Sequence, residues 1–351
     1  MLLTITAAEA LARLDEFSAV IDARSESEFA LDRLPGAINW PVLTDAQRIQ
    51  VGTEYKQISP FVAQKRGAAM VARNIADHIE RDVLDLPKDW KPLVYCWRGG
   101  KRSGSLALIL GQIGFKVHLL EGGYREYRRA VMEALELLPA RFSYRVICGS
   151  TGSGKSRLLQ VLRAHGAQVL DLEALANHRG SVLGLVPGSP QPSQKQFDSR
   201  VWETLRGFDP ARPVFVESES KKVGDLRVPQ PLIECMRASP CLPLELPLPA
   251  RVALLIEDYD FFVTDTAAFC ERLDALRALR GNEVVKAWQE AARAGRTAEV
   301  VLDLLVSHYD PIYTQSINRN FAHSATPLAT LRWDGSPEGL EAAAEEAIKA
   351  G

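Results

Sequence analysis

The chain has 351 residues, of which 46% are hydrophobic and 25% charged, and its formal net charge is −2. The length suggests two domains, because a domain typically has about 100 to 200 residues. The small net charge excludes a general electrostatic attraction to nucleic acid, so any RNA binding must come from local basic patches.

No apolar run approaches the roughly 20 residues of a membrane helix. The N-terminal stretch carries acidic residues in an amphipathic pattern and lacks the features of a signal peptide, so we expect a cytoplasmic protein that has no membrane partner. Its five cysteines form no C-x-x-C pair, which argues against a disulfide framework and a zinc site. We interpret Cys148 and Cys270 as buried structural residues.

The first part of the chain has the pattern of an α/β domain. Short apolar runs bounded by turns predict strands, and longer amphipathic stretches predict helices. A turn at Pro35-Gly36 separates two of these elements. In chain order we predict a helix at 7–17, a strand at 19–22, a helix at 61–81, a strand at 93–95, a helix at 103–113 and a strand at 117–120.

A cysteine follows the strand at 93–95 and opens the sequence CWRGGKRS. Five residues separate Cys96 from Arg102, and the backbone N–H groups of such a loop, with the N-terminus of the next helix, form a cradle for a tetrahedral anion. Arg98, Lys101 and Arg102 surround the sulfur with positive charge, which favours the nucleophilic thiolate. We therefore predict these four residues as catalytic, the alternative being a buried structural cysteine.

A helical pattern stops at Pro139 and a new apolar strand follows, so we predict domains at 1–135 and 136–351. Strands that alternate with helices indicate a mostly parallel sheet in the second domain, with a helical region after Arg251. The stretch 188–196, rich in Pro, Ser and Gln, predicts a mobile loop. The predicted strands are 144–148, 168–170, 214–217 and 242–246, and a helix is predicted at 157–164.

The strand at 144–148 runs into GSTGSGKS, which fits the phosphate-binding pattern G-x-x-x-x-G-K-[ST]. Small residues let successive N–H groups turn toward a polyphosphate, Lys155 adds a point charge, and Ser156 can hold a magnesium ion. Glu217 or Glu219 can serve that metal, the alternative being a solvated strand end. The motif does not identify the polyphosphate, for which ATP is the default. The predicted ligand-binding residues of the loop are Gly149, Ser150, Thr151, Gly152, Ser153, Gly154, Lys155 and Ser156.

Short motifs around the cysteine resemble those of rhodanese domains. They are DARS at 22–25 with Glu28-Phe29, LPGA at 34–37 and EGGY at 121–124. Ordinary rhodaneses, which carry sulfur as a cysteine persulfide, have a loop one residue shorter. The longer C-x5-R loop is shared with phosphatases of the rhodanese fold, and this resemblance implies that Cys96 faces an anion as large as phosphate.

A rhodanese-like domain with this longer loop, followed by a P-loop domain, resembles the tRNA 2-selenouridine synthase family over nearly the whole chain. The order of the motifs carries the resemblance: YCWRGG at 95–100, the P-loop, DLE at 171–173, NHRGS at 177–181, QKQF at 194–197 and ESES at 217–220. The implied fold is α/β, with an N-terminal rhodanese-like domain and a P-loop NTPase-like domain that ends in a helical part.

This resemblance implies a tRNA-modifying transferase. Its substrate would be tRNA with wobble 2-thiouridine, whose sulfur is replaced by selenium from selenophosphate through an S-geranyl intermediate made from geranyl diphosphate. Cys96 would be needed for selenation, by a covalent perselenide or by binding selenophosphate, while Lys155 and Ser156 would anchor the diphosphate. No permanent cofactor is expected, and the selenophosphate-producing enzyme is a candidate partner.

The same resemblance suggests further site residues. His178 and Arg179 are spaced so that both can lie near a phosphate, the alternative being a plain surface pair, and Asp171 can be a metal or base ligand. For each candidate RNA contact the alternative is a solvated helix face. These candidate contacts are Tyr124, Arg125, Tyr127, Arg128, Arg129, Lys221 and Lys222. We interpret the aromatic residues Tyr259, Phe261 and Phe262 as core rather than as a prenyl pocket.

Two other functions fit parts of the sequence. A phosphatase of the rhodanese fold with a nucleotide-binding regulatory domain would release phosphate from generic phosphoesters. A kinase or ATPase fused to a rhodanese-like binding module would turn over ATP in a way that requires Lys155 and is indifferent to Cys96. Both leave the ordered series of family motifs unexplained.

Overall fold

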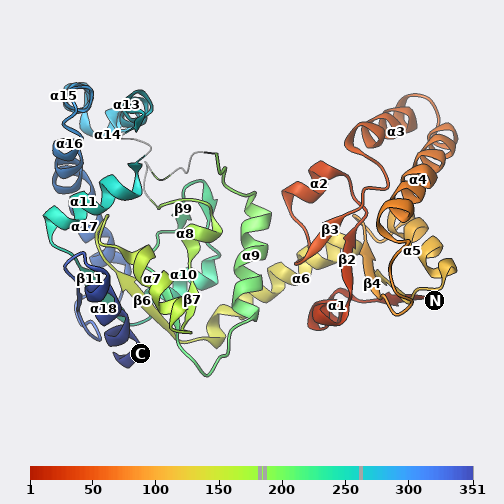
Figure 1. Cartoon of the computed structure of the whole chain (residues 1–351), viewed down its shortest axis with the longest axis horizontal. Helices are drawn as coiled ribbons and strands as arrows, with labels where there is room; N and C mark the ends of the chain where they lie inside the picture. Colours follow the sequence, from red (N-terminus) through yellow and green to blue (C-terminus); the bar gives the residue numbers. More distant parts are fainter. Residues whose placement is uncertain (181–183, 185–187, 261–263, 351) are drawn as a thin grey trace. The chain divides into compact units, whose positions relative to one another are not determined.

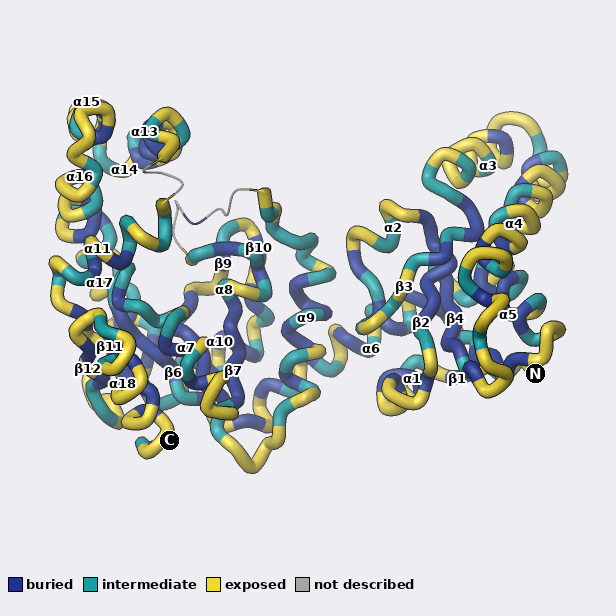
Figure 2. The backbone as a smooth tube through the Cα atoms, in the orientation of Figure 1, coloured by how far each residue is buried: buried dark blue, intermediate teal, exposed yellow. Residues whose placement is uncertain are grey.

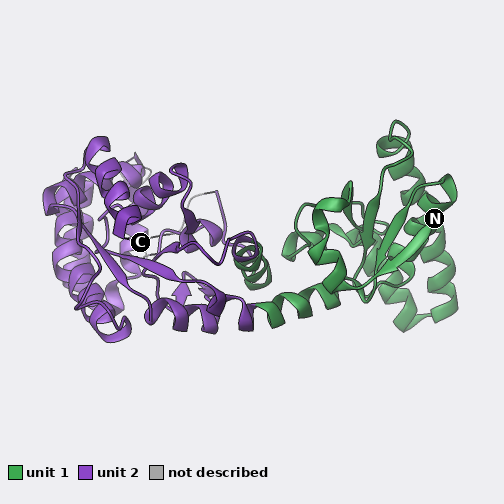
Figure 3. Cartoon of the chain, turned by 90° about the horizontal axis from the view of Figure 1, so that it is seen from below, with its two compact units in different colours: residues 1–134, 193–203 green, residues 135–192, 204–351 purple. Residues whose placement is uncertain are grey.

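The computed structural model describes residues 1–180, 184, 188–260 and 264–350. They form two compact units, shown in different colours in Figure 3. Unit 1 contains residues 1–134 and 193–203, and unit 2 contains residues 135–192 and 204–351. The predicted division at residue 135 did not anticipate that residues 193–203 pack with the first unit.

Unit 1 is built on a five-stranded parallel sheet with the order β1-β5-β4-β2-β3. The four residues of β4 are all buried, so the predicted apolar run is a central strand. In a parallel sheet the carboxyl ends of the strands meet at one edge, and Cys96 follows β4 at this edge. The strands are β1 Leu2–Ile5, β2 Ala19–Asp22, β3 Ala37–Asn39, β4 Pro92–Tyr95 and β5 Val117–Leu120.

The three helices predicted at 7–17, 61–81 and 103–113 are present with changes at their ends, and unit 1 also contains helices that were not predicted. The predicted helix at 7–17 divides into α1 and a 3-10 turn, whose tighter winding lets both Leu14 and Phe17 enter the core. The helix after the cysteine loop begins at Lys101, two residues earlier than predicted. The helices are α1 Ala7–Ala12, η1 Leu14–Glu16, α2 Glu26–Leu31, α3 Asp45–Gln57, α4 Pro60–Asp82, α5 Lys101–Ile113, α6 Gly123–Leu137 and α9 Gln194–Arg206.

The start of α9 shortens the loop predicted at 188–196. Ser193 precedes the helix, and its Oγ accepts a hydrogen bond of 3.1 Å from the backbone N–H of Gln196. This satisfies one of the N–H groups that a helix start leaves without an intrahelical partner. Gln194 and its two successors are therefore helical.

Unit 2 contains a second five-stranded parallel sheet, with the order β12-β11-β6-β8-β7 (Figure 1). β12 was not predicted because two residues are too short to show a period. Between β8 and β11 in the sequence, β9 and β10 form a separate antiparallel pair of strands. The strands are β6 Tyr144–Cys148, β7 Gln168–Leu170, β8 Val214–Glu217, β9 Lys222–Val223, β10 Leu226–Arg227, β11 Cys241–Glu245 and β12 Leu331–Arg332.

The region after Arg251 is largely helical, as predicted. Figure 2 shows buried strands in both sheets and exposed outer faces on the surrounding helices. None of the described helices is long and apolar enough to cross a membrane. The helices of unit 2 are η2 Pro139–Arg141, α7 Lys155–Ala164, α8 Leu172–Leu175, α10 Gln230–Arg237, α11 Leu248–Asp258, α13 Thr266–Asp274, α14 Arg277–Arg280, α15 Asn282–Arg293, α16 Thr297–Asp303, the π-helix η3 Leu304–Tyr309, α17 Asp310–Asn320 and α18 Pro337–Ala350.

Candidate functional site

The cysteine loop of unit 1 lies between β4 and the N-terminus of α5. Cys96 is only 3% exposed, and its Sγ accepts a hydrogen bond of 3.1 Å from the Oγ of Ser103. The backbone N–H of Tyr124 donates to the carbonyl oxygen of Cys96 at 2.8 Å. A Cβ on Gly123 would overlap that carbonyl, so glycine permits the close approach of the two chain segments.

The predicted cations around the sulfur separate into two kinds. Arg102 donates hydrogen bonds of 2.7 and 3.3 Å to the carboxylate of Glu28, whereas Arg98 and Lys101 are exposed. Burial favours the neutral form of Glu28, but the Arg102 pair outweighs it and lowers the pKa of Glu28 below its ordinary value. Glu28 therefore holds Arg102 at the start of α5, while Ser103, absent from the predicted catalytic set, is the side chain that contacts the sulfur.

The P-loop of unit 2 connects β6 to α7, as its motif predicts. Gly152 and Gly154 have positive φ angles of 76° and 88°, which glycine adopts without steric cost. The Nζ of Lys155 lies 2.6 Å from the carbonyl oxygen of Gly149, so the ammonium group closes over the loop. Lys155 is thereby held where it can meet a phosphate bound by the loop N–H groups.

Three residues from distant parts of the chain hold this loop. Arg251 donates hydrogen bonds of 3.0 and 2.7 Å to the carbonyl oxygen of Thr151 and pairs with Asp310. The indole N–H of Trp333 donates to the carbonyl oxygen of Ser153 at 2.9 Å, and the hydroxyl of Tyr313 accepts from the N–H of Gly149 at 2.5 Å. These contacts fix the loop from the helical region and from Trp333, the residue that follows β12.

Carboxylates gather beside Ser156. Its Oγ donates a hydrogen bond of 3.1 Å to Glu173, whose backbone N–H donates to Glu217 at 2.9 Å. Burial raises the pKa of both glutamates above the ordinary range, and burial together with the nearby Glu173 raises the pKa of Glu219 to about 8. The site therefore keeps protons that exposed glutamates lose.

A magnesium role for Glu217 stays a prediction. Glu173 and Glu219 line the cavity at the P-loop, whereas Glu217 lies behind them, 2% exposed, with its Oε2 free of any hydrogen-bond partner. Among the described residues, no group of three or more His, Cys, Asp or Glu side chains is arranged to hold a metal ion. Ser156 with Glu173 offers the oxygen ligands that Mg²⁺ prefers, and phosphate oxygens and water would complete them.

The other three predicted residues also line this cavity. Asp171 caps α8 by accepting a hydrogen bond from the N–H of Ala174 at 2.9 Å. His178 Nδ1 accepts a hydrogen bond from the N–H of Gly180 at 3.0 Å, and burial lowers the pKa of His178, which favours the neutral ring. The guanidinium group of Arg179 lies 4.9 Å from the ring centre of Tyr259 and donates to a backbone carbonyl of α11.

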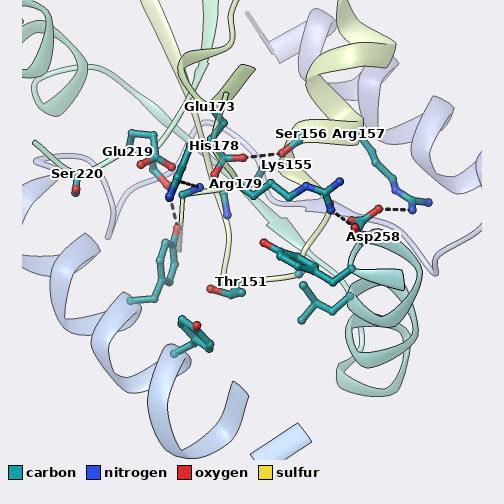
Figure 4. A pocket seen from close by; sticks show the side chains of 18 of the residues that line it. Thr151, Lys155, Ser156, Arg157, Glu173, His178, Arg179, Glu219, Ser220 and Asp258 are labelled. Carbon is teal, nitrogen blue, oxygen red and sulfur yellow. Dashed lines mark hydrogen bonds and ion pairs between the residues drawn. The ribbon is translucent and has the colours of Figure 1, made fainter. Parts of the chain in front are cut away.

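The cavity has a volume of about 760 Å³ and joins a polar floor to an apolar wall (Figure 4). The floor contains the P-loop, Glu173, His178 and Arg179, which Figure 4 shows around one space. The wall comes from the helical region, whose apolar and aromatic lining residues are Leu255, Tyr259, Leu279, Tyr309, Ile312, Tyr313 and Ile317; Asp258, His308 and Ser316 of the same region also line the cavity. Tyr259, interpreted from the sequence as core, packs partly buried against the hydrophobic cluster of the helical region and also lines this cavity. Phe261 and Phe262 lie outside the described residues.

Several predicted RNA contacts have other roles in the structure. Tyr124 and Tyr127 are 3% and 0% exposed, so neither offers a surface for an unstacked base. Arg128 pairs with Asp198, and Arg129 pairs with two glutamates of its own helix. These aromatic residues stand three apart on α6, and this spacing places both on its buried face.

Two sequence profiles match the chain. That of the rhodanese-like domain covers residues 6–130, and that of the tRNA 2-selenouridine synthase AAA domain covers residues 142–280. A tRNA 2-selenouridine synthase from Aeromonas salmonicida is 32% identical over 324 residues, which is 84% of this chain and 86% of the relative. The chain belongs to the tRNA 2-selenouridine synthase family.

Other members of the tRNA 2-selenouridine synthase family show similar likeness. One from Alcanivorax borkumensis is 31% identical over 332 residues, covering 86% of this chain and 90% of the relative. One from Nitrosomonas europaea is 36% identical over 244 residues, but these cover 68% of this chain and 63% of that protein, slightly less than two thirds of it. The predicted fold class is confirmed: a rhodanese-like domain precedes a P-loop domain, and both contain parallel sheets.

Proposed function

We propose that the protein is an enzyme that converts wobble 2-thiouridine in tRNA to 2-selenouridine. Selenophosphate would supply the selenium, and geranyl diphosphate would first alkylate the sulfur. Family membership supports the overall conversion. The observation that supports the geranyl step is that one cavity is lined both by the P-loop and by apolar side chains of the helical region.

A diphosphate with a hydrocarbon tail matches both parts of this cavity. Loop N–H groups and Lys155 suit the diphosphate, because several donors and a point charge bind its oxygens together. Leu279 and Ile312 of the wall are 63% and 51% exposed, so an apolar tail can cover surface that water otherwise contacts. The floor alone would equally suit ATP, and the wall favours a prenyl diphosphate.

In the first reaction, the sulfur of 2-thiouridine attacks C1 of the geranyl group. The C1–O bond breaks, its electron pair leaves with pyrophosphate, and the N3 proton of the base is lost to water. Lys155 and the loop N–H groups stabilise the charge that develops on the leaving group. Ser156 and Glu173 would hold Mg²⁺, which supplies further positive charge when bound.

In the second reaction, selenium replaces the alkylated sulfur. Hydrolysis of selenophosphate yields phosphate and a selenide nucleophile, a C2–Se bond forms, and the C2–S bond breaks with geranylthiol as the leaving group. The Cys96 loop would hold the selenophosphate, because it leads into the N-terminus of α5, where backbone N–H groups that lack intrahelical partners can bind a phosphate. Ser103 donates a hydrogen bond to the sulfur of Cys96.

The test is to incubate the protein with 2-thiouridine tRNA, geranyl diphosphate and selenophosphate, and to identify the nucleosides by mass spectrometry after digestion. Geranylated product is expected without selenophosphate, and 2-selenouridine when both co-substrates are present. Absence of both products would refute the proposal. Phosphate release from simple phosphoesters, or ATP turnover indifferent to Cys96→Ala, would instead favour the phosphatase or the ATPase.

A further inference from the structure

Residues 193–203 lie in the stretch that matches the P-loop family profile, yet they pack with the rhodanese-like unit. Three contacts hold them there. Ser193 donates a hydrogen bond to the carbonyl oxygen of Leu31, Arg128 pairs with Asp198, and the rings of Tyr127 and Trp202 meet edge to face at 6.1 Å. The packing thus joins α9, and the residue that precedes it, to α2 and α6.

α9 also places a hydroxyl against a buried carboxylate of unit 1. Ser199, 5% exposed, donates a hydrogen bond of 3.1 Å to Oδ2 of Asp32, which is 1% exposed. The hydroxyl of Tyr124 donates to the same oxygen at 2.8 Å. Burial raises the pKa of Asp32, and the two hydroxyl donors act against that rise, so both help to keep it ionised.

Tyr124 carries this support to the cysteine loop. Its backbone N–H donates to the carbonyl oxygen of Cys96 at 2.8 Å, and its ring stacks on Trp97 at 5.3 Å. Arg24 donates a hydrogen bond of 2.6 Å to the backbone carbonyl oxygen of Asp32, and its guanidinium carbon lies 4.1 Å from the ring centre of Tyr124. A shift of Tyr124 would therefore move the loop that presents the sulfur.

A second contact from α9 reaches the loop directly. The Nζ of Lys195 lies 5.9 Å from the ring centre of Trp97, the residue that follows the cysteine. The carbonyl oxygen of Lys195 accepts a hydrogen bond of 3.1 Å from Arg128, which fixes the helix at this point. α9 thus contacts Trp97 directly through Lys195 and supports Tyr124 indirectly, through the hydrogen bond of Ser199 to Asp32.

We propose that α9 completes the cysteine site, with Ser199 acting through Asp32 and Tyr124 as a positioning residue for the Cys96 loop. The rhodanese-like domain would then be incomplete without a helix supplied by the P-loop half of the sequence. The consequence for selenation rests on the proposed function. The consequence for the reactivity of Cys96 does not depend on it.

The experiment compares Ser199→Ala, the conservative Ser199→Thr and a matched control in the full chain. The control is Ser18→Ala, because Ser18 accepts a single hydrogen bond, from the N–H of Lys91, just before β2 at the amino ends of the strands. The three variants are alkylated with iodoacetamide, and the labelled cysteines are mapped by mass spectrometry. Selenation and geranylation are measured on the same preparations.

In Ser199→Ala we expect Cys96, buried in the native protein, to be alkylated about tenfold faster and the kcat of selenation to fall about tenfold, as loss of one hydrogen bond to a buried charge suggests. Geranylation by Ser199→Ala should stay at the native rate. Ser199→Thr, which keeps a hydroxyl group, and the control Ser18→Ala should both show the native rates of Cys96 alkylation and of selenation. Native alkylation and selenation rates in Ser199→Ala would overturn the proposal. An equal loss of geranylation would also overturn it, because it would indicate a general role in folding. If the native protein does not selenate tRNA, the alkylation rates still show whether Ser199 positions the Cys96 loop.

Discussion

The hydroxyl of Ser156 donates a hydrogen bond of 3.1 Å to the carboxylate of Glu173. This contact links the last residue of the P-loop motif to a group of acids that also includes the buried Glu217 and Glu219. Nearby like charges cost free energy when they are buried, and the protein lowers that cost by keeping protons on the carboxyl groups. The charge of the P-loop lysine and the protonation of these acids therefore influence one another.

The stability of the protein should fall as pH rises because of this group. The pKa of Glu219 is raised from an ordinary value of 4.5 to about 8, so between these pH values the native state holds a proton that the unfolded chain has lost. Stability decreases with pH wherever the native state binds more protons. Denaturant unfolding from pH 5 to 8 should show this slope, and Glu219→Gln should make it shallower.

A matched control for that slope is Glu299→Gln, which removes an exposed carboxylate on α16. Its pH profile should follow that of the native protein. A Glu219→Gln profile as steep as the native one would show that the slope arises elsewhere in the molecule.

The two anion sites should separate by mutation. Lys155→Ala removes the point charge of the P-loop and should reduce geranylation about a hundredfold, as expected when one charged donor to a leaving group is lost. Cys96→Ala should abolish selenium incorporation and leave geranylation at the native rate. Product nucleosides measured by mass spectrometry decide between the assignments, and the reverse pattern would exchange the roles of the two domains.

Arg251 lies outside the P-loop motif but should contribute to the free energy of unfolding, because it holds the loop in place. Its guanidinium group serves Thr151 and Asp310 together, which a lysine ammonium group cannot match in geometry. Arg251→Lys should lower the free energy of unfolding by about 2 kcal/mol, since a buried carbonyl and a carboxylate lose donors. In denaturant titrations, Arg296→Lys, which changes an exposed pair with Glu299, should alter it by less than about 0.5 kcal/mol.

Arg251 also shows where sequence reasoning reached its limit. The P-loop was predictable because its eight residues are consecutive and lie between a strand and a helix, and the same holds for Cys96 after β4. The residues that hold the loop come from far along the chain: Arg251, Tyr313 and Trp333 are separated from their partners by 100, 164 and 180 positions. No local period encodes such contacts.

A different limit explains the errors on α6. Tyr124 and Tyr127 were considered as surfaces for RNA bases because basic residues surround them. On a helix, however, aromatic residues three apart lie on one face, and that face is buried in unit 1. The spacing of the two tyrosines in the sequence shows that they share a helix face. It does not show whether that face packs against another element or is exposed. That partner includes α9, where Trp202 meets Tyr127.

The apolar wall of the cavity gives the last prediction. Ile312 is 51% exposed on α17 and lines the cavity, so its replacement changes surface that a ligand can cover without opening a void in the core. Ile312→Ala should raise the KM for geranyl diphosphate about tenfold, since roughly 1 to 2 kcal/mol of apolar contact is lost. Inhibition by pyrophosphate, which has no tail, should be unchanged.

Leu302→Ala, on the exposed face of α16 and absent from the cavity lining, is the control and should leave the KM at its native value. If Ile312→Ala weakened pyrophosphate inhibition as much as geranyl diphosphate binding, the wall would act on the P-loop rather than on the tail.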